Sequence, residues 1–457
     1  MNHIFRLTTA AALIGSSVAA MAAVGADEAK QLGTTLTPWG AEKAGNKAGT
    51  IPAYTDGQVK PPANYDPKKP GVRPDPFAEE KPLYSVTAAN MAQHADQLSD
   101  TAKALLQKYP SFRMDVFPTH RTQRYPAYVN DRSLKNAAAC KSVNNGLTIE
   151  GCYGGVPFPI PKTGNEVMWN HNLRYHTPSY VGSFRNFLVD SGGGINMQGE
   201  NELWGEYPTV YPEKNGVLSP SDPYWLIRVN STGPARKAGE KLSFIDYLDP
   251  IQNPRKVWQY LPGQRRVKLA PDLAYDTPNP QSGGATLMDE ASLFLGALDR
   301  FDFKLIGKKE MLIPYNVFKL FDEAACPEAK RYLKGHIGPD CLRWELHRVW
   351  EVEATLKPGA RHAYAKRKFY FDEDQPGVGA SDNYDAAGKL YRGLFGLYTP
   401  FYETTDQGYA DGSVTYDFQT GAYLIQVDTA RGYLLPSAKP QPLRFYTGDA
   451  LAGEGVR

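Results

Sequence analysis

The segment RKVWQYLPGQRRVKLA, residues 255–270, gathers aromatic and basic side chains around a Pro-Gly pair. Pro-Gly suits the centre of a tight turn, so the segment predicts a β-hairpin. With a two-residue loop, Trp258 pairs with Val267 and Tyr260 with Arg265. One face then carries the apolar and aromatic side chains, and Arg265 can lie on a ring and contact the polar group of a ligand. A slip of one residue would exchange the two faces.

Carboxylates recur in residues 372–377, Asp-Glu-Asp-Gln-Pro-Gly. The run matches positions one, three and six of a calcium loop, but Pro376 and Asn383 stand where oxygen ligands belong. We therefore favour a solvated acidic turn over a calcium site. Glu351 and Glu353 share one face of a predicted strand, and we expect that face to be exposed, which disfavours a glycosidase pair.

The common catalytic motifs are missing from the sequence. It contains no Gly-x-Ser-x-Gly, Ser-x-x-Lys, His-Glu-x-x-His, phosphate loop or Gly-x-Gly-x-x-Gly. We therefore expect a protein that is not an enzyme and needs no cofactor or metal.

Four cysteines fall into two near pairs, Cys140 with Cys152 and Cys326 with Cys341. Three connectivities are possible, and the sequence alone does not choose among them. We favour sequential pairing over zinc binding, because neither pair has Cys-x-x-Cys spacing. Disulfides are typical of an exported protein.

The N-terminal region predicts export. Residues 1–26 have a basic start, a short apolar run and small residues at candidate cleavage sites, which is typical of a signal peptide. The run is too short to span a membrane, and we expect no transmembrane segment in the mature chain. Residues 27–82 are rich in Pro and Gly and predict either an ordered arm on the body or a flexible leader.

The remaining residues, 83–457, predict one large β domain with few helices. An apolar stripe favours a helix over 87–109, and a second, shorter helix is expected near 288–298. From about residue 224 the period changes to two, and strand follows strand, as in 343–356 and 364–371. We therefore predict a mainly β fold with a curved antiparallel sheet or an open barrel covered by helices.

Composition agrees with a folded, exported protein. In 457 residues, 51 Lys and Arg face 49 Asp and Glu, so the net charge is only +2. A chain so nearly neutral is not typical of a nucleic-acid binder, and we expect no nucleic-acid partner.

Several long strings resemble the family called domain of unknown function 1329, which comprises exported bacterial proteins. They lie throughout the mature chain: LTPWGAE (36–42), GTIPAY (49–54), GVPFPIP (155–161), MWNH (168–171), YLPGQRRV (260–267), IPYN (313–316) and RWELHRVW (343–350).

The resemblance implies a fold similar to the lipoprotein carrier LolA and its receptor LolB, an incompletely closed barrel around an apolar cavity. It also implies a periplasmic location, and as partners an exporter of the resistance–nodulation–division (RND) type and an outer-membrane protein. The family has no agreed catalytic residues.

Together these observations favour a carrier or adaptor that binds a lipid or other hydrophobic ligand. A non-enzymatic scaffold with a packed core is the alternative, and an envelope hydrolase is the least favoured. The residues expected to contact the ligand are Trp258, Tyr260, Arg265, Val267, Trp344, Leu346, Trp350 and Phe369.

Overall fold

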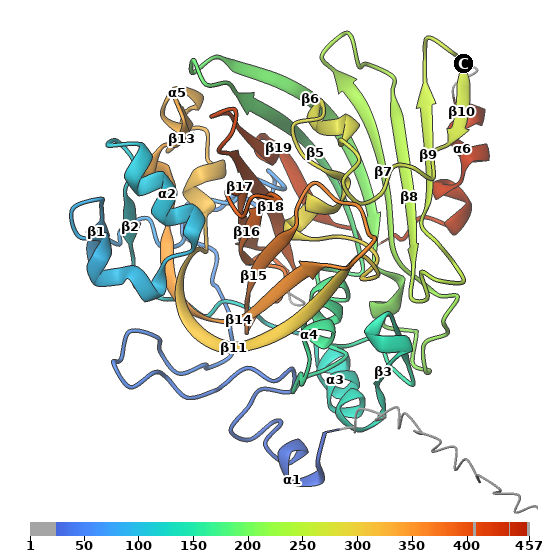
Figure 1. The fold of residues 1–457 in the computed structure, drawn as a ribbon, viewed down its shortest axis with the longest axis horizontal. Coiled ribbons are helices and arrows are strands. Elements are labelled where there is room, and N and C mark those ends of the chain that lie inside the picture. The colour runs from blue at the N-terminus through green and yellow to red at the C-terminus, as the bar shows by residue number, and fades with distance from the viewer. Residues whose placement is uncertain (1–23, 405–407, 438, 455–457) are drawn as a thin grey trace, which may run out of the picture.

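The computed structural model describes residues 24–404, 408–437 and 439–454. The predicted signal peptide, 1–26, lies almost entirely outside them. Strands dominate the described chain, as expected, and most of them belong to one large sheet (Figure 1). Its strands are β1 (Tyr84–Val86), β2 (Met114–Val116), β5 (Ser179–Val189), β6 (Ile195–Glu206), β7 (Pro223–Gly233), β8 (Lys241–Tyr247), β9 (Lys256–Leu261), β10 (Arg266–Leu269), β11 (Phe301–Pro314), β14 (Trp344–Leu356), β15 (Lys366–Asp372), β16 (Gly379–Tyr384), β17 (Leu390–Pro400), β18 (Tyr409–Asp417) and β19 (Tyr423–Pro436).

Smaller elements decorate this sheet. Two short hairpins are β3 (Lys141–Val143) with β4 (Thr148–Glu150), and β12 (Tyr332–Leu333) with β13 (His336–Ile337). The α-helices are α1 (Ala26–Ala29), α2 (Asp100–Lys108), α3 (Ala127–Ala139), α4 (Gly164–Asn172), α5 (Glu328–Arg331) and α6 (Gly448–Glu454). The 3-10 helices are η1 (Met91–Gln97), η2 (Asn144–Gly146), η3 (Pro208–Val210), η4 (Pro280–Ser282), η5 (Met288–Leu293), η6 (Phe318–Phe321), η7 (Pro339–Cys341) and η8 (Leu443–Tyr446). Across the described ranges, no helix combines the length and apolar character needed to cross a bilayer.

The large sheet has 15 strands in the order β1-β2-β14-β15-β16-β17-β18-β19-β5-β6-β7-β8-β9-β10, and β11 pairs with β14. Adjacent strands of this sheet are antiparallel, except that β2 and β14 pair in parallel at Val116 and Trp344. The order ends at β1 and β10, and no pairing between described residues joins these ends. The prediction of a mainly β fold with a curved, incompletely closed sheet is therefore confirmed.

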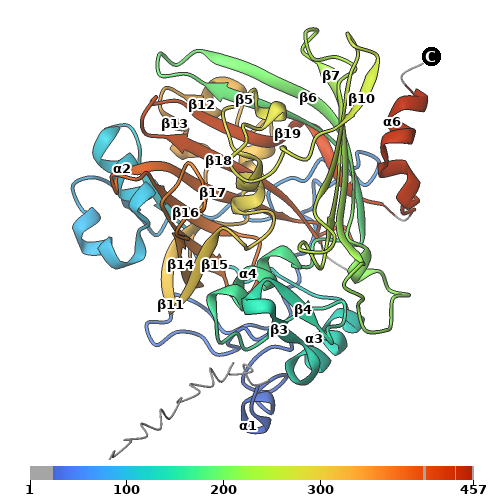
Figure 2. The same cartoon turned by 45° about the vertical axis from the view of Figure 1, so that its right-hand side comes forward.

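Two halves of the sheet meet where β19 pairs with β5. The green strands β5–β8 stand steeply inclined to the orange and red strands β14–β18, so the sheet bends at this seam (Figure 2). The yellow segment that carries η4 and η5 lies between the two halves, and the red helix α6 lies on the far side of β7–β10. Strands β5–β8 therefore have an inner face toward η5 and an outer face toward α6.

The predicted hairpin exists, but its register differs from the prediction. Val267 pairs with Tyr260 and Leu269 pairs with Trp258, because the loop has four residues rather than two. Arg265 lies in this loop with a positive φ of 50° and is exposed, so it does not pair with Tyr260. The shift is by two positions, so the apolar side chains still share one face.

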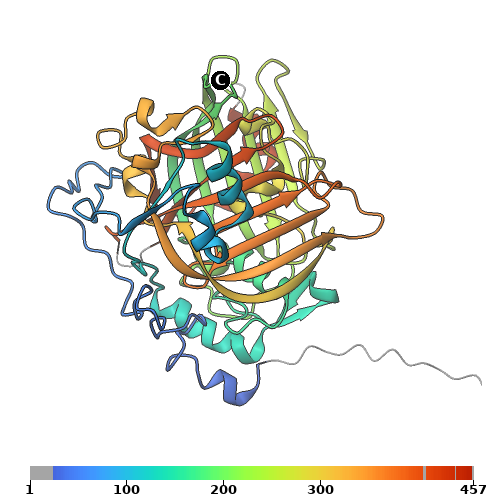
Figure 3. The same cartoon turned by 60° about the vertical axis from the view of Figure 1, so that its left-hand side comes forward.

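The helix expected over 87–109 is two helices, η1 and α2. The chain breaks between them because the Ser99 hydroxyl caps α2 by accepting from Ala102 N. The buried carboxylate of Asp382 also accepts from the backbone N–H groups of Asp100 and Thr101. Helix α2 lies over the strands β16 and β17 (Figure 3).

The helix expected over 288–298 is largely absent. Only the short 3-10 helix η5 forms, and it contains non-helical residues at Ala291 and Ser292. The chain is extended again at Phe294. The acidic side chains of η5 form buried ion pairs, described below. These ion pairs, rather than helical hydrogen bonds, fix the position of the segment.

Residues 27–82 form an ordered arm on the body. Trp39 is buried, with its ring 5.4 Å from that of Tyr54 and 4.6 Å from that of Tyr125. Farther along, Arg73 forms a partly buried ion pair with Glu403 and donates to Leu434 O. The segment therefore contacts the body at two separate places, near Trp39 and near Arg73.

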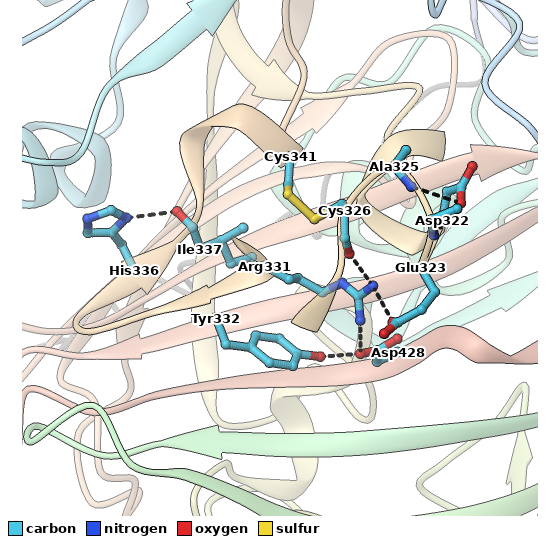
Figure 4. Close-up of a disulfide and its surroundings, with 11 residues drawn as sticks. Asp322, Glu323, Ala325, Cys326, Arg331, Tyr332, His336, Ile337, Cys341 and Asp428 are labelled. Carbon is cyan, nitrogen blue, oxygen red and sulfur yellow. Dashed lines mark hydrogen bonds and ion pairs between the residues drawn. A yellow bond between two sulfur atoms is a disulfide. The ribbon is translucent and has the colours of Figure 1, made fainter. Parts of the chain in front are cut away.

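The cysteines are paired sequentially, Cys140 with Cys152 and Cys326 with Cys341, the connectivity favoured from the sequence. Figure 4 shows that the second disulfide lies beside the buried guanidinium of Arg331. Arg331 donates to Cys326 O at 2.6 Å and forms an ion pair with Asp428 of β19 at 3.1 Å. This disulfide therefore holds the loop that anchors an irregular part of β19.

Candidate functional site

A cavity of about 140 Å³ lies between the inner face of β5–β8 and the segment with η4 and η5. Alternate residues of each strand point to the same face, so a few positions per strand line it. The apolar wall consists of Phe184, Leu203, Ile227, Val229, Leu242, Phe244, Met288, Leu295 and Leu434.

A second cavity of about 350 Å³ adjoins the first. Arg255 and Leu295 line both cavities and so stand between them. The wall of the second cavity includes Trp169, Tyr224 and Tyr275. The second cavity is lined by both apolar and charged residues, the latter including Asp246, Lys256 and Asp289.

The charges on the cavity walls are paired. Arg174 lies 3.2 Å from Asp411, and both oxygens of Asp246 accept from Arg255 at 2.6 and 2.7 Å. Burial alone would raise the pKa of Asp411, but His176 and Arg174 outweigh it and lower the pKa, so the carboxylate stays ionised. The first cavity therefore has charged groups but each faces an opposite charge.

Helix η5 covers the first cavity and is held by buried ion pairs. Asp289 lies 2.8 Å from Arg367 of β15 and 3.0 Å from His362. The next residue, Glu290, lies 3.3 Å from Arg392 of β17 and accepts from Leu287 N. These contacts tie the cover to the other half of the sheet.

Some polar groups at the cavity form no well-aligned hydrogen bond with the described residues. They include Trp225 Nε1 and Asn172 Oδ1, and both residues line the cavity. The hydroxyls of Tyr180 and Tyr207 lie within reach of the Trp225 ring nitrogen, and each interacts with its N–H group. Gly205 makes room for Tyr180, since a Cβ there would lie 2.1 Å from Tyr180 Cζ.

The structure places four of the predicted contact residues on β9, β10 and their loop. Trp258 belongs to the outer face, where it packs with Leu226 and Ile245, beneath Tyr446. Tyr260 and Val267 share that face, and the Arg265 side chain is exposed. The inner face of β9 carries Val257 instead, which packs with Met288.

The other four lie in the opposite half of the sheet. Trp344 and Leu346 are buried in a core with Phe395, whereas Phe369 and Trp350 belong to a second core around Phe294. The eight residues therefore do not form one wall, and none is among the described residues that line the cavity at η5. Their contact with a ligand stays a prediction.

The N-terminal half of β14 is polar and buried, contrary to the expected exposed face. Glu345 accepts from Arg343 at 2.5 Å, and His347 Nε2 lies 3.1 Å from Glu345 Oε2. Burial alone would lower the pKa of His347, but Asp372 and Glu345 outweigh it and raise the pKa to about 9. Burial would raise the pKa of Glu345, yet Arg343 and His347 lower it to about 2.

The acidic run 372–377 joins this buried network, so the prediction of a solvated turn is wrong. Asp372, Glu373 and Asp374 are all buried, and Arg121 donates to both oxygens of Asp374 at 2.7 Å. Ionised side chains remain inside a protein when they are paired. Here the partners come from distant segments, which is why the sequence pattern suggested exposure.

Three of these buried groups are close enough to share a cation. Possible ligand atoms of His347, Asp372 and Asp374 lie within 4.8 Å of one another. However, Arg121 occupies both oxygens of Asp374, and a ligating imidazole must be neutral whereas the raised pKa keeps His347 protonated. The arrangement fits an ion-pair network better than a metal centre.

Sequence reasoning missed the cavity-lining residues. Most of them are spread over α4, six strands and the η4–η5 segment. One signal was present, namely the alternation in β7, where Trp225, Ile227 and Val229 share a face. The pattern reveals a face but not whether it borders a hollow.

The chain belongs to the family described as "Protein of unknown function (DUF1329)", which matches residues 85–452. It is 38% identical over 451 residues to the uncharacterized protein PA3922 of Pseudomonas aeruginosa, covering 96% of this chain and 95% of that protein. The predicted family is therefore confirmed.

Solved structures similar to this chain include one family member and one sorting protein. A DUF1329 family protein from Desulfovibrio piger matches with a TM-score of 0.38 at 13% identity, covering 60% of this chain and 92% of that one. A putative outer membrane lipoprotein-sorting protein domain from Vibrio parahaemolyticus matches with a TM-score of 0.42 at 11% identity, covering 63% and 97%.

Proposed function

We propose that this protein is a periplasmic carrier or adaptor that binds a lipid or other hydrophobic ligand without catalysis. The observation that carries the proposal is the apolar cavity between the inner face of β5–β8 and η5. Burial of each methylene in such a space contributes about 0.8 kcal/mol before the costs of immobilisation. The paired disulfides and the predicted signal peptide support the periplasmic location.

An apolar cavity of this size can bind a small hydrophobic molecule or one end of a larger one. A cavity of about 150 Å³ lined by aliphatic and aromatic side chains takes up benzene. The cavity at η5 has a similar volume of about 140 Å³, and the adjoining one adds room for a longer chain. The proposed ligand therefore has a compact end under η5 and an extension past Arg255.

The direct test is native mass spectrometry of protein purified from the envelope, followed by solvent extraction. We expect a bound hydrophobic molecule in the wild type. Ala291, which lines the cavity from η5, is replaced by Trp to fill it, and we expect about a tenfold loss of bound ligand.

The matched control is Ala387→Trp, in the exposed turn between β16 and β17, which should retain the ligand. If the wild type carries nothing, or if both variants retain the ligand equally, the cavity is not the binding site.

A non-enzymatic scaffold is the second candidate, and the fully packed cores of the C-terminal half favour it. An RND-type exporter and an outer-membrane partner are proposed only on the family resemblance. Co-purification of the full chain with envelope proteins, with Ala291→Trp as comparison, separates the two candidates. A scaffold keeps its partners when the cavity is filled.

A further inference from the structure

The polar groups of the first cavity define the head group of its ligand. We infer that the cavity takes an uncharged amphiphile whose head carries a hydroxyl or similar neutral hydrogen-bonding group near Trp225, Tyr180 and Tyr207. This inference rests on the proposed function, because it assumes that a hydrophobic ligand enters at all.

The charge balance of the wall argues for a neutral head. Asp411 already pairs with Arg174, and Asp246 occupies two nitrogens of Arg255. An ionised head group would have to separate one of these buried pairs, which leaves a carboxylate without its partner. Among the described residues that line the cavity, both arginines already face a carboxylate, so neither offers an unpaired positive charge to a fatty-acid carboxylate.

The unmet hydrogen bonds argue for a polar head rather than a pure hydrocarbon. Trp225 Nε1 is a buried donor that forms no well-aligned hydrogen bond with the neighbouring hydroxyls of Tyr180 and Tyr207, and Asn172 Oδ1 is a buried acceptor without a donor among the described residues. Buried polar groups in native proteins usually have partners, so these groups are candidates for contact with a ligand. A hydroxyl can accept from the indole and donate to a neighbouring oxygen.

The surrounding wall positions this head. The rings of Tyr180 and Tyr207 are stacked at 5.9 Å, and the ring of His176 lies 4.8 Å from Tyr180. The Tyr180 ring packs against Gly205 of the neighbouring strand β6, where there is no side chain to displace it. Beyond this polar corner the wall becomes aliphatic at Leu203 and Val229. An amphiphile thus has one favourable orientation, with its head at the tyrosines.

The experiment compares 1-octanol, octanoate and octane at pH 7 as displacers of the neutral fluorophore N-phenyl-1-naphthylamine from delipidated protein. We expect 1-octanol to displace it best. If the fluorophore and all three compounds fail to bind, the proposed function itself is wrong. If the fluorophore binds but octanoate or octane competes as well as octanol, only the present inference is overturned.

Variants then locate the head group. Trp225→Phe keeps an aromatic ring and removes the donor, and we expect it to weaken octanol binding about fivefold with octane unchanged. Tyr180→Phe should act in the same direction. Trp204→Phe, on the outer face beside Phe445, is the matched control and should leave all three compounds unchanged. An equal loss for octanol and octane in Trp225→Phe would mean that the indole only packs, and would overturn the inference.

Discussion

His347 contributes a charge to the buried network on β14. Its raised pKa, about 9 against an ordinary 6.5, means that folding favours the protonated ring. This contribution to stability is complete below pH 6.5 and is lost as the pH rises through 9. The lowered pKa of Glu345, about 2, adds stability above pH 4.5 that is lost as the pH falls toward 2. The network is therefore most stabilising between pH 4.5 and 6.5.

We expect His347→Gln to lower the melting temperature by roughly 2–6 °C near pH 6, with a difference that shrinks toward pH 10. Thermal melts of both proteins from pH 5 to 10 measure this. His94→Gln, a partly exposed ring stacked on Tyr84, serves as the control. A deficit that is constant over the whole range would show that the loss comes from packing and not from charge.

At the scale of elements, η5 covers the first cavity and is fixed there by ion pairs. Its two acidic residues reach β15 and β17, so its position depends on the half of the sheet opposite β5–β8. A segment with few helical hydrogen bonds opens more readily than a regular helix when its side-chain anchors are weakened. The cover is therefore the element through which a ligand is expected to leave.

We expect Glu290→Gln, which keeps the shape but removes the charge facing Arg392, to speed amide hydrogen exchange over 288–295 several-fold and to speed ligand release. Exchange mass spectrometry and stopped-flow displacement of the fluorophore measure the two effects. Glu202→Gln, on an exposed site of β6, should change neither. Unchanged exchange in 288–295 would mean that other contacts hold the cover.

At the scale of the whole molecule, the N-terminal arm is part of the fold. Trp39 packs between two tyrosines, and a Cβ at Gly40 would lie 1.6 Å from Pro159 O. We expect Trp39→Ala to lower the melting temperature by several degrees, because truncation of a buried aromatic residue typically costs about 3–5 kcal/mol. Limited proteolysis should then cut the arm between 27 and 82. If the variant resists proteolysis like the wild type, the arm is held mainly by contacts farther along, such as Arg73 with Glu403.

Much of this architecture follows from local sequence. The alternation in 343–356 predicts β14, and the spacing of the cysteines favours the pairing found. Contacts between distant segments cannot be predicted from local sequence. Alternation does not tell which face of β9 meets the C-terminal residues, or that Arg121 pairs with Asp374. The acidic run 372–377 differs from expectation for this reason, and the same limit explains why the eight expected contact residues lie on different faces and in different cores of the sheet.

The pairing of β19 with β5 also dictates an order of assembly. Strands β5–β10 and β14–β18 can each form from neighbouring hairpins, but the seam joins residues 179–189 to residues 423–436. Bringing such distant segments together is entropically slow compared with closing hairpins. The hollow beneath η5 therefore takes shape only once β19 has docked against β5, so a chain truncated before β19 would lack part of the cavity wall.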